Sequence, residues 1–89
     1  MAKDTVVVKI GSRILTTPDG KLDLNSLRNL VHQIAQIPDI YNVVVVSSGA
    51  ITTGAEFMHT VPQTIPENQA AASVGQCLLI QQYFGFFQE

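Results

Sequence analysis

The sequence contains little charge, and this shortage excludes several classes of protein. Only 13% of the 89 residues are charged, with five Lys and Arg against seven Asp and Glu, while 46% are hydrophobic. In typical soluble domains about a quarter of the residues are charged, and disordered chains have few apolar residues. This composition therefore excludes an intrinsically disordered chain. The formal net charge of -2 provides no basic surface for nucleic acid or for an anionic membrane.

Cysteine and long apolar runs are also scarce. The single cysteine, Cys77, cannot form an internal disulfide, and the two histidines, His32 and His59, show no metal-ligand spacing. We therefore expect no metal site, and we expect Cys77 to be a small buried apolar residue. No segment resembles a signal peptide or approaches the roughly 20 apolar residues that span a bilayer. These absences predict a cytoplasmic protein without membrane contact.

The first half of the chain predicts a strand, a helix and a second strand. Residues 5–10 and 42–47 are almost continuously apolar and rich in valine, which is typical of strands covered on both faces in a parallel sheet. Asp23 can cap a helix that continues to Ile37, because Pro38 ends it. Its apolar positions recur at helical spacing: Leu24, Leu27, Leu30, Val31, Ile34 and Ile37. This order predicts a βαβ unit of an α/β fold.

The second half predicts two helices. Residues 50–58 form a short one, residues 59–66 a loop, and Pro66 begins a long helix that continues toward the end. The expected apolar stripe of the long helix is Ala71, Val74, Cys77, Leu78 and either Leu79 or Ile80. The aromatic residues within 83–87 are expected to make core contacts. So much apolar surface in so short a chain predicts that residues 1–89 are the N-terminal portion of one larger α/β domain.

Two short polar segments follow the predicted strands, at the positions where ligands bind in parallel α/β proteins. The first, Lys9-Ile10-Gly11-Ser12, offers an ammonium group, an unobstructed backbone and a hydroxyl group. The second, Ser47-Ser48-Gly49-Ala50, offers hydroxyl groups before a predicted helix N-terminus, where free N–H groups and the helix dipole favour an anion. Together these segments predict a site for a phosphate or a carboxylate group.

Each of these residues also has an explanation that requires no ligand. A lysine such as Lys9 can protect a sheet edge from aggregation, although its apolar neighbours favour a central strand. A glycine after a strand, such as Gly11 or Gly49, often provides a turn with a positive φ angle. Ser47 or Ser48 can cap the following helix, although capping accounts for only one of the two serines. The sequence leaves these alternatives open.

A phosphate-binding P-loop is excluded. Gly49 and Gly54 have the glycine spacing of that motif, but Ala55-Glu56 follows where Lys and Ser or Thr are needed to reach the phosphates and magnesium. No dinucleotide-binding fingerprint follows either predicted strand.

Three segments together resemble one branch of a known family. They are Val7-Val8-Lys9-Ile10-Gly11-Ser12, then Val46-Ser47-Ser48-Gly49-Ala50-Ile51 with Gly54, then Gln69-Ala70-Ala71-Ala72-Ser73-Val74-Gly75-Gln76. The chain resembles the amino-terminal part of the glutamate 5-kinase branch of the amino acid kinase family over essentially all 89 residues. The resemblance implies the beginning of a three-layer αβα fold with a parallel sheet, incomplete in this chain.

The resemblance also implies a reaction and its participants. These enzymes transfer the γ-phosphoryl group of ATP to the side-chain carboxylate of L-glutamate, giving glutamyl 5-phosphate in the first step of proline biosynthesis. The resemblance implies a catalytic role for Lys9. It implies that the ATP phosphates are bound by Lys9, Gly11 and Ser12. It assigns glutamate binding to Ser48, Gly49 and Ala50. The Mg²⁺ ligands and half of the active site would lie outside these 89 residues, so we expect the segment alone to be inactive.

Two other functions remain open at this stage. The chain can be a non-catalytic module that binds a nucleotide or another anion, or a structural fragment that associates with itself. If the kinase interpretation holds, we expect a homo-oligomer.

Overall fold

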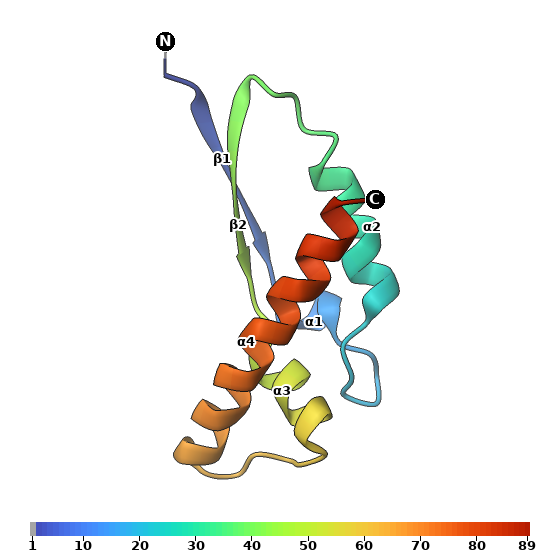
Figure 1. Cartoon of the computed structure of the whole chain (residues 1–89), viewed down its shortest axis with the longest axis vertical. Coiled ribbons are helices and arrows are strands. Elements are labelled where there is room, and N and C mark those ends of the chain that lie inside the picture. The colour runs from blue at the N-terminus through green and yellow to red at the C-terminus, as the bar shows by residue number, and fades with distance from the viewer. Residues whose placement is uncertain (1) are drawn as a thin grey trace.

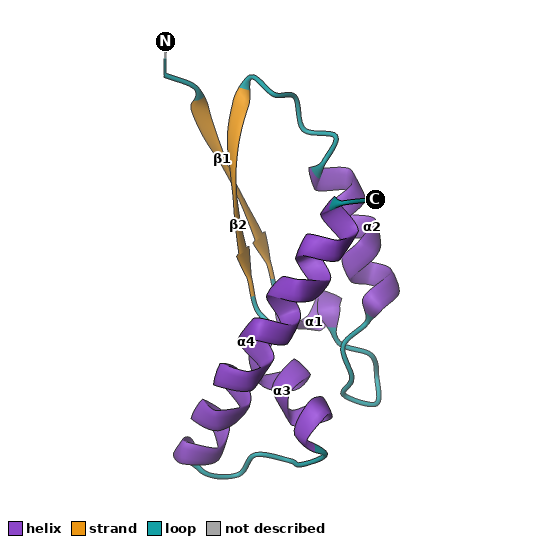
Figure 2. Ribbon diagram, viewed as in Figure 1, coloured by secondary structure: helices purple, strands orange, loops and turns teal. Residues whose placement is uncertain are grey.

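The computed structural model describes residues 2–89, which form a parallel strand pair and four helices (Figures 1 and 2). The elements are β1 (Asp4–Ile10), α1 (Ser12–Leu15), α2 (Leu24–Ile34), β2 (Tyr41–Ser47), α3 (Ala50–Met58) and α4 (Ile65–Phe87). This order confirms the predicted α/β class, and the short helix α3 has the predicted bounds. None of the helices within residues 2–89 is long and apolar enough to span a membrane.

The two strands pair in parallel along their whole length. Val7 lies opposite Val44, and Ile10 lies opposite Ser47. Each strand begins one residue earlier than the valine-rich pattern predicts. Because the strands are parallel and in register, their carboxyl ends meet at the same edge, as the βαβ prediction requires.

Helix α2 begins at its predicted cap and ends earlier than expected. The Asp23 carboxylate accepts a hydrogen bond from the Ser26 backbone N–H at 3.1 Å, which satisfies a donor at the helix start. Regular α-helix ends at Ile34, and the Ile37 N–H then donates to the Ile34 carbonyl at 3.0 Å in a tighter turn. Pro38 is consistent with this end, since a proline has no N–H to donate to the carbonyl four residues earlier, which is that of Ile34.

The core lies between one face of the strand pair and the helices α2 and α4. Alternate strand residues, Val8 and Ile10 in β1 with Val43 and Val45 in β2, face this core. The buried members are Ile10, Leu15, Leu27, Val31, Ile34, Leu79 and Tyr83.

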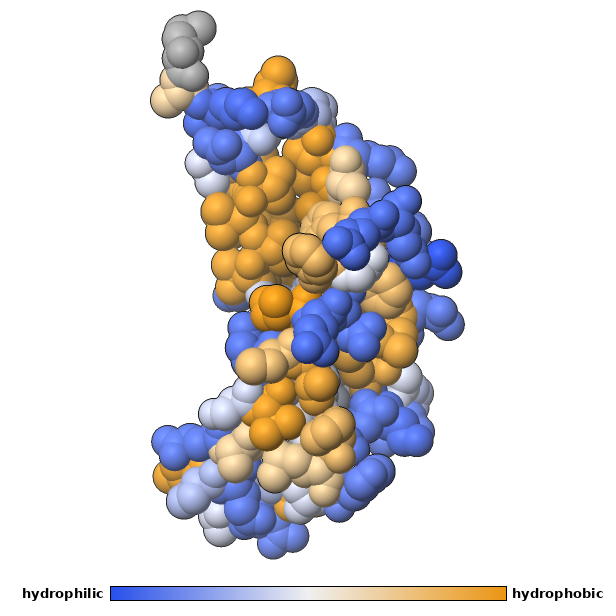
Figure 3. All heavy atoms as spheres, viewed as in Figure 1, coloured by the Kyte–Doolittle hydropathy of each residue, from blue (hydrophilic) through white to orange (hydrophobic). Residues whose placement is uncertain are grey.

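The opposite face of the strand pair is open within residues 2–89. Val7 is 62% exposed, and Val44 and Val46 are each 47% exposed. The sequence pattern predicts strands covered on both faces, whereas the helices described here cover only one. Figure 3 shows that apolar surface extends over the two strands.

Helix α3 packs against the N-terminal half of α4 (Figure 1) through two glycines. A Cβ atom added at Gly75 would lie 1.6 Å from the Ala50 carbonyl oxygen, and one added at Gly54 would lie 1.8 Å from the Ala71 carbonyl oxygen. The two backbones therefore touch directly at these positions. The glycine spacing that mimics a P-loop serves helix packing at its second glycine.

The buried stripe of α4 differs from the predicted one. Its buried residues, Ala71, Gly75, Leu79 and Tyr83, recur at every fourth position. The expectation for Ala71 and Leu79 is confirmed, and Val74 and Leu78 are half-buried. The expectation of a buried Cys77 is wrong, because Cys77 lies about 200° around the helix from Gly75 and is exposed. Of the predicted alternatives Leu79 and Ile80, Leu79 is the buried one, and Ile80 is 53% exposed.

The two ends of α4 have different surroundings. Thr64 caps the start by accepting a hydrogen bond from the Glu67 N–H at 3.2 Å, so the helix begins at Ile65 and Pro66 takes its second position. At the other end Tyr83 is buried and Phe86 packs against the core, whereas Phe84 is 64% exposed. Core contact is therefore confirmed for only part of the aromatic segment.

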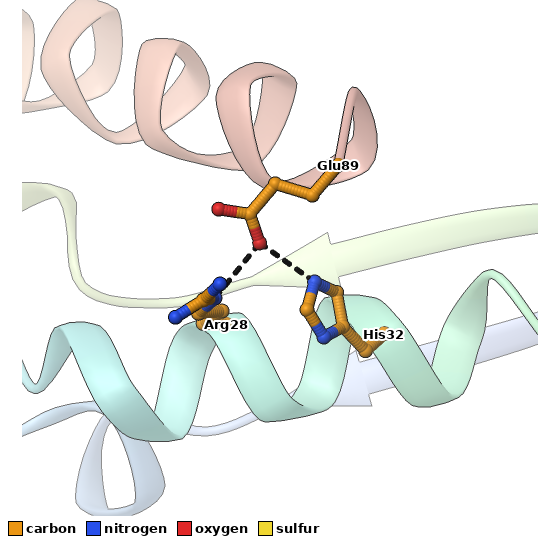
Figure 4. Close-up of polar contacts among 3 residues, drawn as sticks. All are labelled: Arg28, His32 and Glu89. Carbon is orange, nitrogen blue, oxygen red and sulfur yellow. Dashed lines mark hydrogen bonds and ion pairs between the residues drawn. The ribbon is translucent and has the colours of Figure 1, made fainter.

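An ion-pair cluster joins the end of the chain to α2 (Figure 4). Glu89 Oε1 lies 2.8 Å from Arg28 Nε and 2.8 Å from His32 Nε2. The hydrogen bond from Arg28 holds the pKa of Glu89 below its ordinary value, and the contact with His32 acts in the same direction. These contacts hold the last turn of α4 beside α2.

The close approach of α3 and α4 predicts a strong effect of one methyl group. Gly75→Ala should lower the free energy of unfolding by about 1–3 kcal/mol or more, since the new Cβ overlaps the Ala50 carbonyl. Gly85→Ala is the matched control in the same helix, because a Cβ there meets no atom within 4 Å. Urea denaturation should give a lower midpoint for Gly75→Ala and an equal or higher midpoint for Gly85→Ala. Equal midpoints for the two variants would contradict the packing described here.

The Glu89 cluster predicts a contribution to stability that depends on pH. A pKa lowered by folding stabilises the protein above the unfolded-state pKa, and this stabilisation is lost as the pH falls through the lower folded-state value. Glu89→Gln should therefore reduce stability near neutral pH, and its difference from the parent should shrink as the pH falls through the lowered folded-state pKa of Glu89. Asp39→Asn is the control, because Asp39 is fully exposed in its pair with Lys3 and should show a smaller difference. Urea midpoints measured from pH 7 downward test this, and a difference independent of pH would refute it.

Candidate functional site

The two polar segments predicted from the sequence meet where the strands end. The Ser48 backbone N–H donates a hydrogen bond to the Ile10 carbonyl at 2.9 Å, which joins the second segment to the first. Lys9 lies opposite Val46 in the register, one step before this contact. The parallel pairing thus places Lys9, Gly11 and Ser48 at one edge of the strand pair.

Gly49 has a backbone reason to be glycine. Its φ angle is 108°, in the left-handed region, and it forms the N-cap of α3. A Cβ atom at this position would lie 3.6 Å from Leu15 and 3.9 Å from Leu79, both buried beneath the turn. The turn explanation offered for Gly49 is therefore confirmed.

Within the described part of the chain, neither a positive φ angle nor close packing requires a glycine at position 11. Its φ angle is -82°, which any residue adopts, and no atom beyond its two chain neighbours lies within 4 Å of an added Cβ. The turn explanation is wrong for Gly11. A glycine here leaves the backbone accessible to a group that approaches from outside.

Neither serine caps α3. The N-cap is Gly49, and no side chain accepts a capping hydrogen bond at this helix start. The Ser47 hydroxyl instead donates to the Ser48 carbonyl at 2.8 Å and accepts a hydrogen bond from the Tyr83 hydroxyl at 2.6 Å. Ser48 is exposed, and its hydroxyl makes no hydrogen bond within residues 2–89. The capping explanation is thus wrong, and Ser48 presents a free hydroxyl.

Lys9 is exposed on the open face of the strand pair. Its position alternates with the core-facing residues Val8 and Ile10, so its side chain lies on the side away from α2 and α4. None of the ion pairs among residues 2–89 includes Lys9. Both strands of the pair are sheet edges, so protection of an edge also stays a prediction for Lys9.

Ser12 and Ala50 each begin a helix beside these residues. Ser12 is the first residue of α1 and is exposed, whereas Ala50 is the half-buried first residue of α3. The first backbone N–H of α3 to bond back along the helix is that of Thr53, which donates to the Gly49 carbonyl at 3.0 Å. The N–H groups before it have no helical acceptor, so the start of α3 favours a negatively charged group.

Tyr83 also reaches the strand ends, although the sequence predicts only core contacts for it. Its side chain is 8% exposed, and burial raises the pKa of its hydroxyl, which therefore stays protonated as a donor. Tyr83 follows Leu79 by four residues, a spacing that signals burial on one helix face. No sequence signal, however, reveals its contact with Ser47, which is 36 residues away.

Metal-ligating groups do not gather within the described residues. No cluster of three or more His, Cys, Asp or Glu side chains suited to a metal ion occurs among residues 2–89.

One cavity of the structure lies beside α3. It has a volume of about 730 Å³ and is bordered by residues 19–21, by α3 and by residues 59–62. The predicted site residues do not line it. The candidate site is at the strand ends, because the parallel register and the Ser48–Ile10 hydrogen bond bring the predicted site residues together there.

Comparison with known proteins gives consistent matches. The model of the amino acid kinase family matches residues 4–89. "Glutamate 5-kinase 2" of Bacillus subtilis (strain 168) is 42% identical over 85 residues, which cover 92% of this chain and 23% of the relative. "Glutamate 5-kinase" of Clostridium tetani is 44% identical over 87 residues, covering 94% of this chain and 33% of the relative. "Glutamate 5-kinase" of Bifidobacterium animalis subsp. lactis is 48% identical over 85 residues, covering 92% and 22%.

The chain thus spans between about a fifth and a third of the length of these relatives. The family match covers nearly the whole chain and includes both strand ends. The parallel strand pair with its connecting helix fits part of the corresponding fold. The chain therefore belongs to the amino acid kinase family.

Proposed function

We propose that this chain supplies the N-terminal part of a glutamate 5-kinase active site. The observation that carries the proposal is Gly11, a glycine that neither backbone angles nor packing within residues 2–89 require. Beside it stand the free hydroxyl of Ser48 and the N-terminus of α3. Relatives named glutamate 5-kinase, 42–48% identical over nearly the whole chain, support this choice among the family's activities.

In this proposal Lys9 acts on the phosphoryl group. An oxygen of the glutamate side-chain carboxylate attacks the γ-phosphorus of ATP, the bond to the β-phosphate oxygen breaks, and ADP leaves. Negative charge on the transferring group must be stabilised, and phosphoryl transfer depends on such electrostatics and on positioning. The Lys9 ammonium would supply that charge, while the backbone at Gly11 and Ser12 would hold the phosphates.

The second loop would hold glutamate. The Ser48 hydroxyl and the backbone N–H groups at Gly49 and Ala50 are suited to bind a carboxylate, since the start of α3 favours negative charge. This arrangement would place the acceptor carboxylate and the phosphoryl group at the same end of the strand pair.

The rest of the enzyme would come from further chain. We propose that residues 1–89 are the N-terminal portion of a single kinase domain, because the matched segment covers only 23% and 33% of two of the relatives. Mg²⁺ would then accompany ATP, held by residues other than those described here. A cytoplasmic homo-oligomer is the form that we propose for the complete enzyme.

The proposal predicts that the segment alone lacks activity and that completion restores it. Residues 1–89 incubated with ATP, Mg²⁺, glutamate and hydroxylamine should yield no glutamyl hydroxamate. A chimera in which residues 1–89 replace the matching segment of the Bacillus subtilis relative should yield it. Hydroxamate from the segment alone would contradict the claim of an incomplete site. Saturable ATP binding by the segment in calorimetry, together with an inactive chimera, would support a binding module instead.

The role of Lys9 predicts a large loss of turnover in the same chimera. Lys9→Ala should lower kcat on the order of 10²-fold or more, the scale of losing one charge contact in a transition state. Lys3→Ala is the matched control, because Lys3 pairs only with the exposed Asp39 and should keep the parental rate. Steady-state hydroxamate formation measures both variants. An unchanged kcat for Lys9→Ala would refute the assigned role.

A further inference from the structure

The Tyr83 hydroxyl lies at one end of a short chain of hydrogen bonds that leads to Ser48. It donates to the Ser47 hydroxyl at 2.6 Å, and the Ser47 hydroxyl donates to the Ser48 carbonyl at 2.8 Å. Tyr83 comes from α4, whereas Ser47 is the last residue of β2 and Ser48 follows it. The side chain of Tyr83 is 8% exposed, so its ring is fixed in the core and its hydroxyl is held in place.

The backbone of Ser48 is consequently held on both sides. Its N–H donates to the Ile10 carbonyl at 2.9 Å, and its carbonyl accepts from Ser47. The next residue, Gly49, adopts the left-handed conformation that begins α3. The direction in which the Ser48 side chain leaves the backbone is therefore set by one bond from β1 and one chain of bonds from α4.

We propose that Tyr83 is a positioning residue for glutamate binding, acting through Ser47 on the Ser48 peptide. The inference rests on the proposed function, in which Ser48 binds glutamate. Tyr83 itself does not touch the substrate in this proposal. The Tyr83 hydroxyl donates to the Ser47 oxygen, so the Ser47 hydroxyl cannot donate its own proton to Tyr83. This keeps the Ser47 proton directed at the Ser48 carbonyl.

The test is a comparison of Michaelis constants in the chimera that completes the chain. Tyr83→Phe removes the hydroxyl and keeps the ring. It should raise KM for glutamate about three- to tenfold, the effect of one lost hydrogen bond, and leave KM for ATP within about twofold of the parent. Tyr41→Phe is the matched control, because this tyrosine lies at the start of β2, at the other end of the strand, and should leave both constants unchanged.

Changes at Ser47 test whether Tyr83 acts through that residue. Ser47→Ala should raise KM for glutamate at least as much as Tyr83→Phe, and the double variant should resemble Ser47→Ala alone. Ser47→Thr keeps a hydroxyl group and should retain a KM for glutamate near that of the parent. Additive effects in the double variant would overturn the proposed route.

The outcomes separate this inference from the proposed function. An active parent in which Tyr83→Phe leaves KM for glutamate unchanged overturns the role of Tyr83 and leaves the proposed function intact. A Tyr83→Phe variant with a lower urea midpoint and equal changes in both Michaelis constants assigns Tyr83 a structural role only. A parent that forms no glutamyl hydroxamate contradicts the proposed function, and with it the glutamate site on which Tyr83 would act.

Discussion

The candidate site depends first on the direct contact between the backbones of α3 and α4. Gly54 and Gly75 let the helices approach until each glycine faces a carbonyl group of the other helix. This contact holds the first turn of α3 in place against α4, and therefore positions the Gly49 turn relative to the strand ends. Leu79, one turn after Gly75 on α4, then lies beneath that turn beside Leu15. The strand pair alone would leave the turn without this support.

Much of the fold follows from local sequence signals. The valine runs, the Asp23 cap and Pro38 are each explained by interactions within a few residues, and the structure confirms the elements that they predict. The contact of the two polar segments follows from parallel strands, since a βαβ unit brings both carboxyl ends to one edge. Local chemistry and one topological rule therefore predict the location of the candidate site.

The structure differs from the sequence predictions where contacts between residues far apart in the chain determine which side chains are buried or bonded. Cys77 is a small apolar residue, but the contact at Gly75 determines which face of α4 is buried, and Cys77 lies on the other face. The two serines resemble helix caps, yet Gly49 takes the cap position and Tyr83 engages Ser47 from 36 residues away. A sequence pattern records which residues are apolar or polar. It does not record which helix will press against which turn.

The open face of the strand pair makes the chain prone to aggregation while that face is uncovered. Within residues 2–89, Val7, Val44 and Val46 form an uncovered β-branched surface, and the outer edges of β1 and β2 have no strand partner. Such edges can pair with strands of other molecules, which makes them templates for aggregation. The charged side chain of Lys9 interrupts this surface. The residue proposed to stabilise a phosphoryl group would thus also act as a gatekeeper against aggregation until the face is covered.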